Sequence, residues 1–177
     1  SSIGSNAKIG DGEIIVAEAD ESDRSFLKLS PTVAVITNID LEHLDHYRDI
    51  DDIKEAFLQF ANIVPFYGST VICLDDANVR EILPAVKRRT ITYGIKEAAE
   101  YRADRISFSG GGSAFDLYHK NELLGVVRLS VPGMFNVYNA MATIAVAREM
   151  EMPFAAVCEG IKTYTGVQRR LEIKGEA

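Results

Sequence analysis

Two short apolar segments near the start of the chain each end abruptly in acidic residues. Segment 14–17 (IIVA) precedes EADESD, and segment 33–36 (VAVI) precedes TNIDLEHLDHY. Because β-branched apolar runs are typical of buried parallel strands, we predict neighbouring strands at 13–17 and 32–38. Ligands of open α/β sheets bind beyond the carboxyl ends of the strands. We therefore expect Glu18 and His43 on one rim, where carboxylates and an imidazole would suit magnesium or manganese.

The next part of the chain alternates helical and strand patterns. Apolar residues spaced by three and four predict an amphipathic helix at 49–61. A strand at 69–74 follows, then a helix at 76–86 that Pro84 should end or bend, and a short strand at 90–93. This alternation predicts an α/β fold with a mostly parallel sheet flanked by helices.

The pattern changes after residue 100. The segments RISFS, AFDLYH and LLGVVRL are separated by the turn-forming stretches GGGS and KNE. They predict an antiparallel β meander at about 101–131, added to the parallel sheet. An alanine-rich helix at 136–150 should follow, then a helix with Pro153 in its first turn and a last strand at 171–173.

Composition indicates an ordinary globular protein. A chain of 177 residues suits one domain, and 47% hydrophobic with 25% charged residues is typical of such domains. The net charge of −7 argues against nonspecific nucleic-acid binding. No apolar stretch approaches the roughly 18 residues of a membrane span, and no leader pattern is present. Cys73 and Cys158 are expected to be buried free thiols, which favours a reducing, cytoplasmic location.

Four sequence blocks together resemble the central, ATP-binding domain of the Mur ligases. In order, they are EADESDxSFLKLSP, TNIDxxHLDHY, PGxxNVxNAxA and GVxRRLE, and the resemblance runs from about Ser2 to the last residue. It implies an ATP-dependent carboxylate–amine ligase of peptidoglycan precursor synthesis, with Mg²⁺ as a cofactor. Within the family, it implies an enzyme that joins L-alanine to UDP-N-acetylmuramate. The oligomeric state is not indicated.

One family feature is missing from the sequence. Mur ligases carry a phosphate loop of the GxxxxGK[ST] type upstream of the matched region, and no such motif occurs here. They also carry an N-terminal UDP-substrate domain and a C-terminal domain. We therefore expect residues 1–177 to be a partial central domain without its first strand and helix, and the isolated chain to be inactive.

The resemblance implies that Glu18 and His43 are magnesium ligands. Glu42 stands where the family has an aspartate next to this histidine. The alternatives are a solvated carboxylate at a strand end and a histidine in a structural loop. His46 is expected only to orient that loop.

The resemblance also places Asn136 and Asn139 at the adenine of ATP. Their spacing puts both on one face at the start of a helix, and a carboxamide matches the N6/N7 edge of adenine. Asn136 alone could instead be a helix N-cap. Phe135 replaces the usual family histidine, so it can stack on adenine but cannot hydrogen-bond it.

The remaining candidate residues concern the substrates. By resemblance, Arg169 faces the phosphates of the nucleotide, and Arg170 faces the reacting phosphate and the nucleotide-sugar substrate. Guanidinium groups suit such oxygens, although paired arginines are also often solvated. Glu21 and Ser22 are candidates for contacting the muramoyl substrate, and a loop that caps a helix is the alternative for them.

Two other functions remain open from the sequence. The first is a metal-dependent hydrolase built on the EADESD and HLDH residues, although only three histidines are available to complete a metal site. The second is a non-catalytic nucleotide-binding module, which the missing phosphate loop favours.

Overall fold

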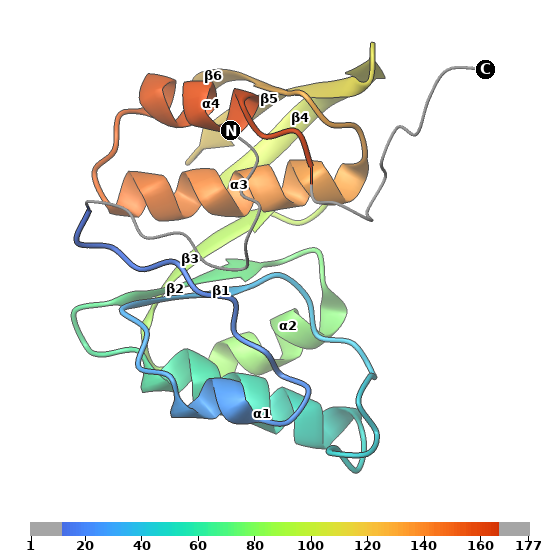
Figure 1. Cartoon of the computed structure of the whole chain (residues 1–177), viewed down its shortest axis with the longest axis vertical. Coiled ribbons are helices and arrows are strands. Elements are labelled where there is room, and N and C mark those ends of the chain that lie inside the picture. The colour runs from blue at the N-terminus through green and yellow to red at the C-terminus, as the bar shows by residue number, and fades with distance from the viewer. Residues whose placement is uncertain (1–11, 167–177) are drawn as a thin grey trace.

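The computed structural model describes residues 12–166 and contains a single six-stranded sheet with helices on both faces (Figure 1). The strands lie side by side in chain order: β1 (Val33–Ile36), β2 (Ser69–Cys73), β3 (Arg89–Gly94), β4 (Tyr101–Ser109), β5 (Gly112–His119) and β6 (Glu122–Leu129). Strands β1 to β4 pair in parallel, whereas β4, β5 and β6 pair antiparallel. The prediction of a parallel α/β sheet extended by an antiparallel meander is confirmed.

The four α-helices begin and end close to the predicted positions, and two 3₁₀ helices accompany them. They are the 3₁₀ helices η1 (Ser25–Lys28) and η2 (Leu83–Ala85) and the α-helices α1 (Ile50–Ile63), α2 (Ala77–Ile82), α3 (Met134–Glu149) and α4 (Phe154–Lys162). Asp49 caps α1, because its side chain accepts a hydrogen bond from the backbone N–H of Asp52 at 2.9 Å. As predicted, Pro84 ends the α-helical path and the chain continues as η2. None of the described helices is both long and apolar enough to cross a bilayer.

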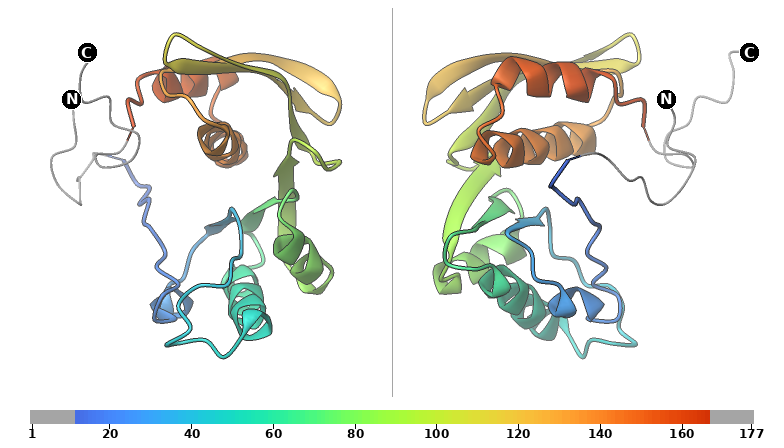
Figure 2. Two further views of the ribbon diagram at one scale, coloured as in Figure 1. Left: turned by 90° about the vertical axis from the view of Figure 1, so that its right-hand side faces the viewer. Right: turned by 60° about the vertical axis from the view of Figure 1, so that its left-hand side comes forward.

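The sheet separates two hydrophobic cores. Successive side chains of a strand point to opposite faces, so Ile72 packs with α1 and α2 while Val71 and Cys73 pack with α3 and the antiparallel strands. Figure 2 shows α1 and α2 on one side of the parallel strands, and α3 and α4 on the other, beneath the curled meander. Cys73 is buried and Cys158 is partly buried, and both are free thiols.

Segment 13–17 was predicted as a strand, and this prediction is wrong. The segment is irregular, and the side chains of Ile15 and Val16 are each 93% exposed. Its apolar composition suits a buried strand, but a strand also needs a hydrogen-bonding neighbour. Here β1 is the edge of the sheet, and no described strand pairs with its free side. The carboxylates after this segment are therefore positioned by loop contacts and not by a strand end.

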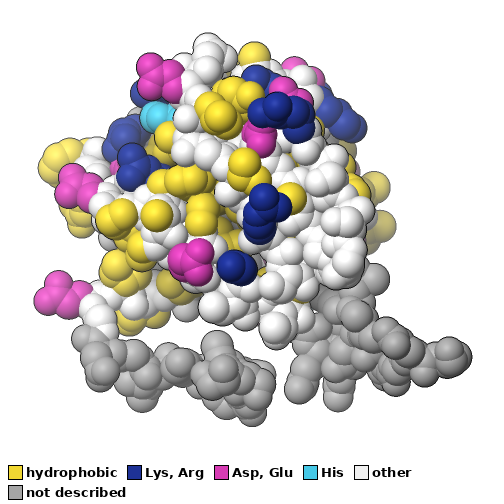
Figure 3. Space-filling model, turned by 90° about the horizontal axis from the view of Figure 1, so that it is seen from above, with side chains coloured by type: hydrophobic (Ala, Val, Ile, Leu, Met, Phe, Trp, Pro, Cys, Tyr) yellow, Lys and Arg dark blue, Asp and Glu magenta, His cyan; other side chains and the backbone are white. Residues whose placement is uncertain are grey.

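The end of the molecule that carries β4–β6 and α4 has a mixed surface (Figure 3). Hydrophobic, basic and acidic side chains are mixed on this face. Leu123 and Val126 of β6 are among the exposed apolar residues of this part of the protein. Some charges on this part of the protein are paired locally, for example Arg102 with Asp104, whose N–O distance is 3.2 Å. Acidic and basic groups are thus interspersed on this face.

Candidate functional site

The loops that follow β1 and β2 leave the same edge of the parallel sheet. The loop after β1 carries His43, and the loop after β2 carries Asp75. This carboxyl edge is where open α/β sheets bind their ligands.

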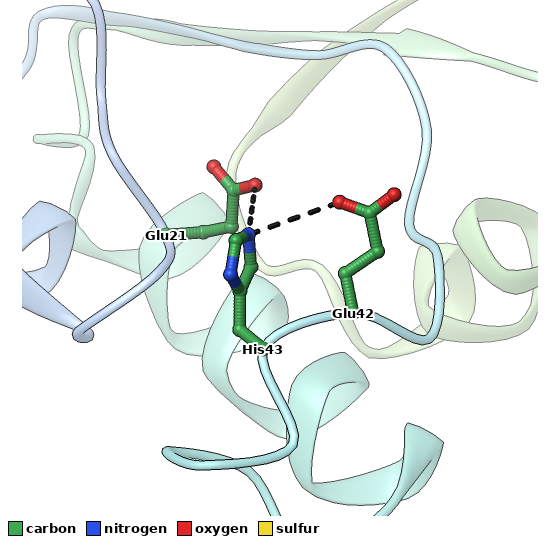
Figure 4. Close-up of side chains that lie close together, drawn as sticks. All are labelled: Glu21, Glu42 and His43. Carbon is green, nitrogen blue, oxygen red and sulfur yellow. Dashed lines mark ion pairs between the residues drawn. The ribbon is translucent and has the colours of Figure 1, made fainter.

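Glu21, Glu42 and His43 form a cluster of possible metal ligands near this edge (Figure 4). The His43 Nε2 atom lies 3.4 Å from a Glu21 carboxylate oxygen and 3.8 Å from a Glu42 carboxylate oxygen. One ligand atom from each of the three residues lies within 4.8 Å of the others. Two carboxylates and one imidazole fit a hard divalent cation and leave other coordination positions to water or phosphate oxygens.

The predicted pair of Glu18 and His43 is not the group that the structure brings together. Glu18 is exposed in the irregular segment before η1, and its carboxylate is not part of the cluster. Glu21 takes this place beside His43. Ser22 lies in a turn in which its backbone N–H donates to the Asp20 carboxylate at 2.9 Å. The proposed roles of Glu18 and Ser22 stay predictions.

Long-range contacts hold the EADESD loop against the HLDHY loop. The Tyr47 hydroxyl donates to the Glu21 carbonyl oxygen at 2.6 Å, and the Arg24 guanidinium lies 4.6 Å from the centre of the Tyr47 ring. Arg24 also pairs with the buried carboxylate of Asp52 on α1, at 2.5 Å. These residues keep Glu21 near His43. Sequence analysis missed them, because nothing in their local pattern marks them as partners.

Asp52 makes the stability of this arrangement sensitive to acid. Hydrogen bonds from the Arg24 side chain, and then from the Arg48 backbone and side chain, hold the pKa of Asp52 well below its usual range. A depressed folded-state pKa gives stabilisation that is fully present above the unfolded-state pKa of about 4. That stabilisation is lost progressively as the pH falls further below this value.

We expect Asp52→Asn to lower the free energy of unfolding at pH 7. The difference in this free energy between the variant and wild type should become smaller below pH about 4, because wild type then loses the same stabilisation. Urea unfolding of the chain at several pH values between 7 and 2.5 measures this. The matched control is Asp51→Asn, since the Asp51 side chain is 85% exposed and, within residues 12–166, pairs only with Lys54, at 3.5 Å. A gap between Asp52→Asn and wild type that stays constant with pH would contradict the assignment.

Helix α3 carries the two asparagines predicted to contact adenine. The N-cap of α3 is Gly133, so Asn136 is not the cap; its side-chain amide donates to the Pro132 carbonyl oxygen at 2.6 Å. Asn139, one turn further on, is exposed, and its side chain forms no hydrogen bond with another residue of the 12–166 region. Phe135 is also exposed, at 48%. Asn139 is therefore the freer of the two amides for binding a ligand.

A cavity of about 450 Å³ lies beside these asparagines, between α3, α4 and β6. Its walls are mainly apolar, and the polar side chains in its lining are Asn136, Asn139, Thr143 and Tyr164. This volume is within the usual range of small-molecule sites. Apolar walls with two carboxamides at one side can enclose a heteroaromatic ring and hydrogen-bond its edge.

Two other predicted features lie outside the described residues. They are the paired arginines, Arg169 and Arg170, and the expected strand at 171–173. The roles of both arginines stay predictions.

Comparisons with known proteins agree on one family. Residues 5–147 match the family model described as the Mur ligase middle domain. A UDP-N-acetylmuramate–L-alanine ligase from Syntrophus aciditrophicus (strain SB) is 65% identical over 99% of this chain and 36% of its own length. The ligase of the same name from Geotalea uraniireducens (strain Rf4) is 54% identical over 99% of this chain and 38% of its own length.

A solved structure supports the same relationship. The crystal structure of the UDP-N-acetylmuramate–alanine ligase MurC from Thermotoga maritima matches this fold with a TM-score of 0.77 and 26% identity. The match covers 90% of this chain and 35% of that one. The chain thus spans little more than a third of the proteins that it matches.

Proposed function

This chain belongs to the Mur ligase family, and on that premise we propose that it is part of the central, nucleotide-binding domain of an ATP-dependent ligase. The substrates proposed for the whole protein are UDP-N-acetylmuramate and L-alanine. The observation that carries this proposal is the 65% identity, across 99% of this chain, with a ligase of that name. We place the reaction in the cytoplasm, which the two free thiols favour.

The proposed reaction forms an amide bond in two steps. The carboxylate of UDP-N-acetylmuramate attacks the γ-phosphorus of ATP, which gives an acyl phosphate and releases ADP. The amine of L-alanine then attacks the acyl carbon, so that the amide forms and inorganic phosphate and a proton leave. The protein contributes mainly positioning and charge compensation to such a phosphoryl transfer.

Each part of the candidate site has a place in this proposal. His43 with Glu21 and Glu42 would hold Mg²⁺, and Glu18 is the further ligand implied by the family resemblance. When bound, Mg²⁺ would offset charge on the phosphate oxygens. Ser22, with Glu21, is proposed to contact the muramoyl group.

The nucleotide would lie along the same edge of the sheet. The α3–α4 cavity, with Asn136 and Asn139, is proposed to bind the adenine. Arg169 is proposed to face the nucleotide phosphates, and Arg170 to face the reacting phosphate and the nucleotide-sugar substrate. Guanidinium groups suit these oxygens because they donate paired hydrogen bonds in one plane.

We expect the full-length protein to form UDP-N-acetylmuramoyl-L-alanine with ATP and magnesium, and the isolated 177-residue chain to form none. The isolated chain lacks a phosphate loop, and without one the β- and γ-phosphates have no backbone cradle. Chromatographic detection of the product and of ADP measures both proteins side by side.

Phosphate release measured in a reaction without L-alanine distinguishes the proposed ligase from a hydrolase. A ligase should then release little inorganic phosphate, whereas a hydrolase would release it at an undiminished rate. ATP-dependent product from the isolated chain would overturn the requirement for the missing loop. Absence of product from the full-length protein would refute the proposed substrates.

A further inference from the structure

Asp75 joins three separate parts of the structure at the carboxyl edge of the sheet. It follows β2, and its carboxylate accepts hydrogen bonds from the backbone N–H groups of Ile95 at 2.7 Å, Lys96 at 3.0 Å and Glu97 at 2.9 Å. The same carboxylate accepts a hydrogen bond from the Tyr138 hydroxyl at 2.6 Å. The loop after β2, the loop after β3 and the first turns of α3 therefore meet at one side chain.

The bond between Tyr138 and Asp75 involves an ionised carboxylate at neutral pH. Partial burial alone would raise the pKa of Asp75, but hydrogen bonds from Tyr138 and the three backbone N–H groups outweigh it and lower the pKa. Hydrogen bonds to an ionised acceptor are stronger than those between neutral groups. This contact is therefore able to constrain the helix that carries Tyr138.

Tyr138 lies on α3 between the two asparagines of the cavity but faces away from it. At about 100° per residue, it is roughly 200° around the helix from Asn136 and roughly 100° from Asn139. It is not part of the cavity lining. The N-terminus of α3 has no side-chain cap from any described residue, since its N-cap is Gly133. The hydrogen bond between Tyr138 and Asp75 thus connects this end of the helix to the loop after β2.

We infer that Tyr138 and Asp75 are a positioning pair, which sets the rotation of the first turns of α3 and so places Asn139 at the nucleotide. This inference rests on the proposed function, because it assigns the α3–α4 cavity to adenine. Neither residue needs to touch the nucleotide. The pair acts through the Asn139 amide, from a face of the helix about 100° away that does not line the cavity.

The test is Tyr138→Phe in the full-length ligase, which removes the hydroxyl and keeps the ring that packs against the core. We expect the Michaelis constant for ATP to rise about three- to tenfold and the preference for ATP over GTP to fall. The turnover number and the Michaelis constants for the other substrates should stay within about twofold. The matched control is Tyr67→Phe, because Tyr67 is 69% exposed in the loop between α1 and β2.

A double-mutant cycle with Asp75→Asn tests whether the two residues act together. If they do, Tyr138→Phe should change ATP binding little once Asp75 is replaced. The inference would be overturned if the effects of the two substitutions on ATP binding simply add. It would also be overturned if the Tyr138→Phe enzyme has a lower melting temperature but binds ATP as wild type does. Titration of ADP binding gives the same comparison without turnover. If the wild-type protein forms no product, the proposed function is wrong. If wild type is active and Tyr138→Phe leaves ATP binding unchanged, only the inference of a positioning pair is rejected.

Discussion

His43→Ala in the proposed full-length ligase should slow phosphoryl transfer by roughly 10²- to 10³-fold, which corresponds to about 3–4 kcal/mol. The reason is geometric, since the His43 Nε2 atom faces both Glu21 and Glu42 in the cluster of possible metal ligands. His46→Ala should cost far less, because its Nε2 atom lies 3.5 Å from exposed Asp45 and belongs to no such cluster within residues 12–166. Single-turnover formation of ADP measures the step directly.

The two carboxylate candidates need separate variants. Glu18→Gln tests the ligand implied by the family motif, and Glu21→Gln tests the one that the structure places beside His43. Replacement of a true metal ligand should raise the magnesium concentration needed for the half-maximal rate, so each variant is titrated with Mg²⁺. A severe loss in His46→Ala together with a benign His43→Ala would reverse the assignment within HLDH.

The sequence was a reliable guide wherever the local pattern and the tertiary structure agree. Helix α1 follows from its apolar spacing, and the meander follows from alternating strands separated by turn residues. The same reasoning failed for segment 13–17. Apolar β-branched residues express a preference for a strand, but pairing depends on a neighbour that the local pattern does not reveal. Ile15 and Val16 therefore remain exposed beside an unpaired sheet edge.

The candidate site was predictable to a similar extent. The motif made His43 a candidate, but the approach of Glu21 depends on Tyr47, Arg24 and Asp52. Their contacts join the EADESD loop to the HLDHY loop and to helix α1, more than twenty residues away. No periodicity encodes such contacts. Asn136 illustrates a smaller difference. Helix α3 begins two residues earlier than predicted, so this amide reaches back to the Pro132 carbonyl and is partly committed to the helix start.

Because the Asn136 amide already donates to the Pro132 carbonyl, we expect Asn139 to form most of the hydrogen bonds that recognise adenine. In the proposed full-length ligase, Asn139→Ala should raise the Michaelis constant for ATP by roughly 5- to 150-fold, or about 1–3 kcal/mol, because the amide that would pair with adenine is lost. It should also weaken discrimination against GTP, since an amide that both donates and accepts matches the N6/N7 edge of adenine. Steady-state kinetics with the two nucleotides measure both effects.

Phe135→His is the companion variant, because it restores the family residue next to Asn136. Phe135 is 48% exposed at the start of α3, so the smaller imidazole should be accepted without loss of stability. It should leave ATP binding unchanged or tighten it slightly, by adding a donor that a phenyl ring lacks. Because Asn139 is exposed, its alanine variant should keep the wild-type melting temperature. A well-folded Asn139→Ala enzyme with unchanged nucleotide preference would show that this asparagine is only part of the helix.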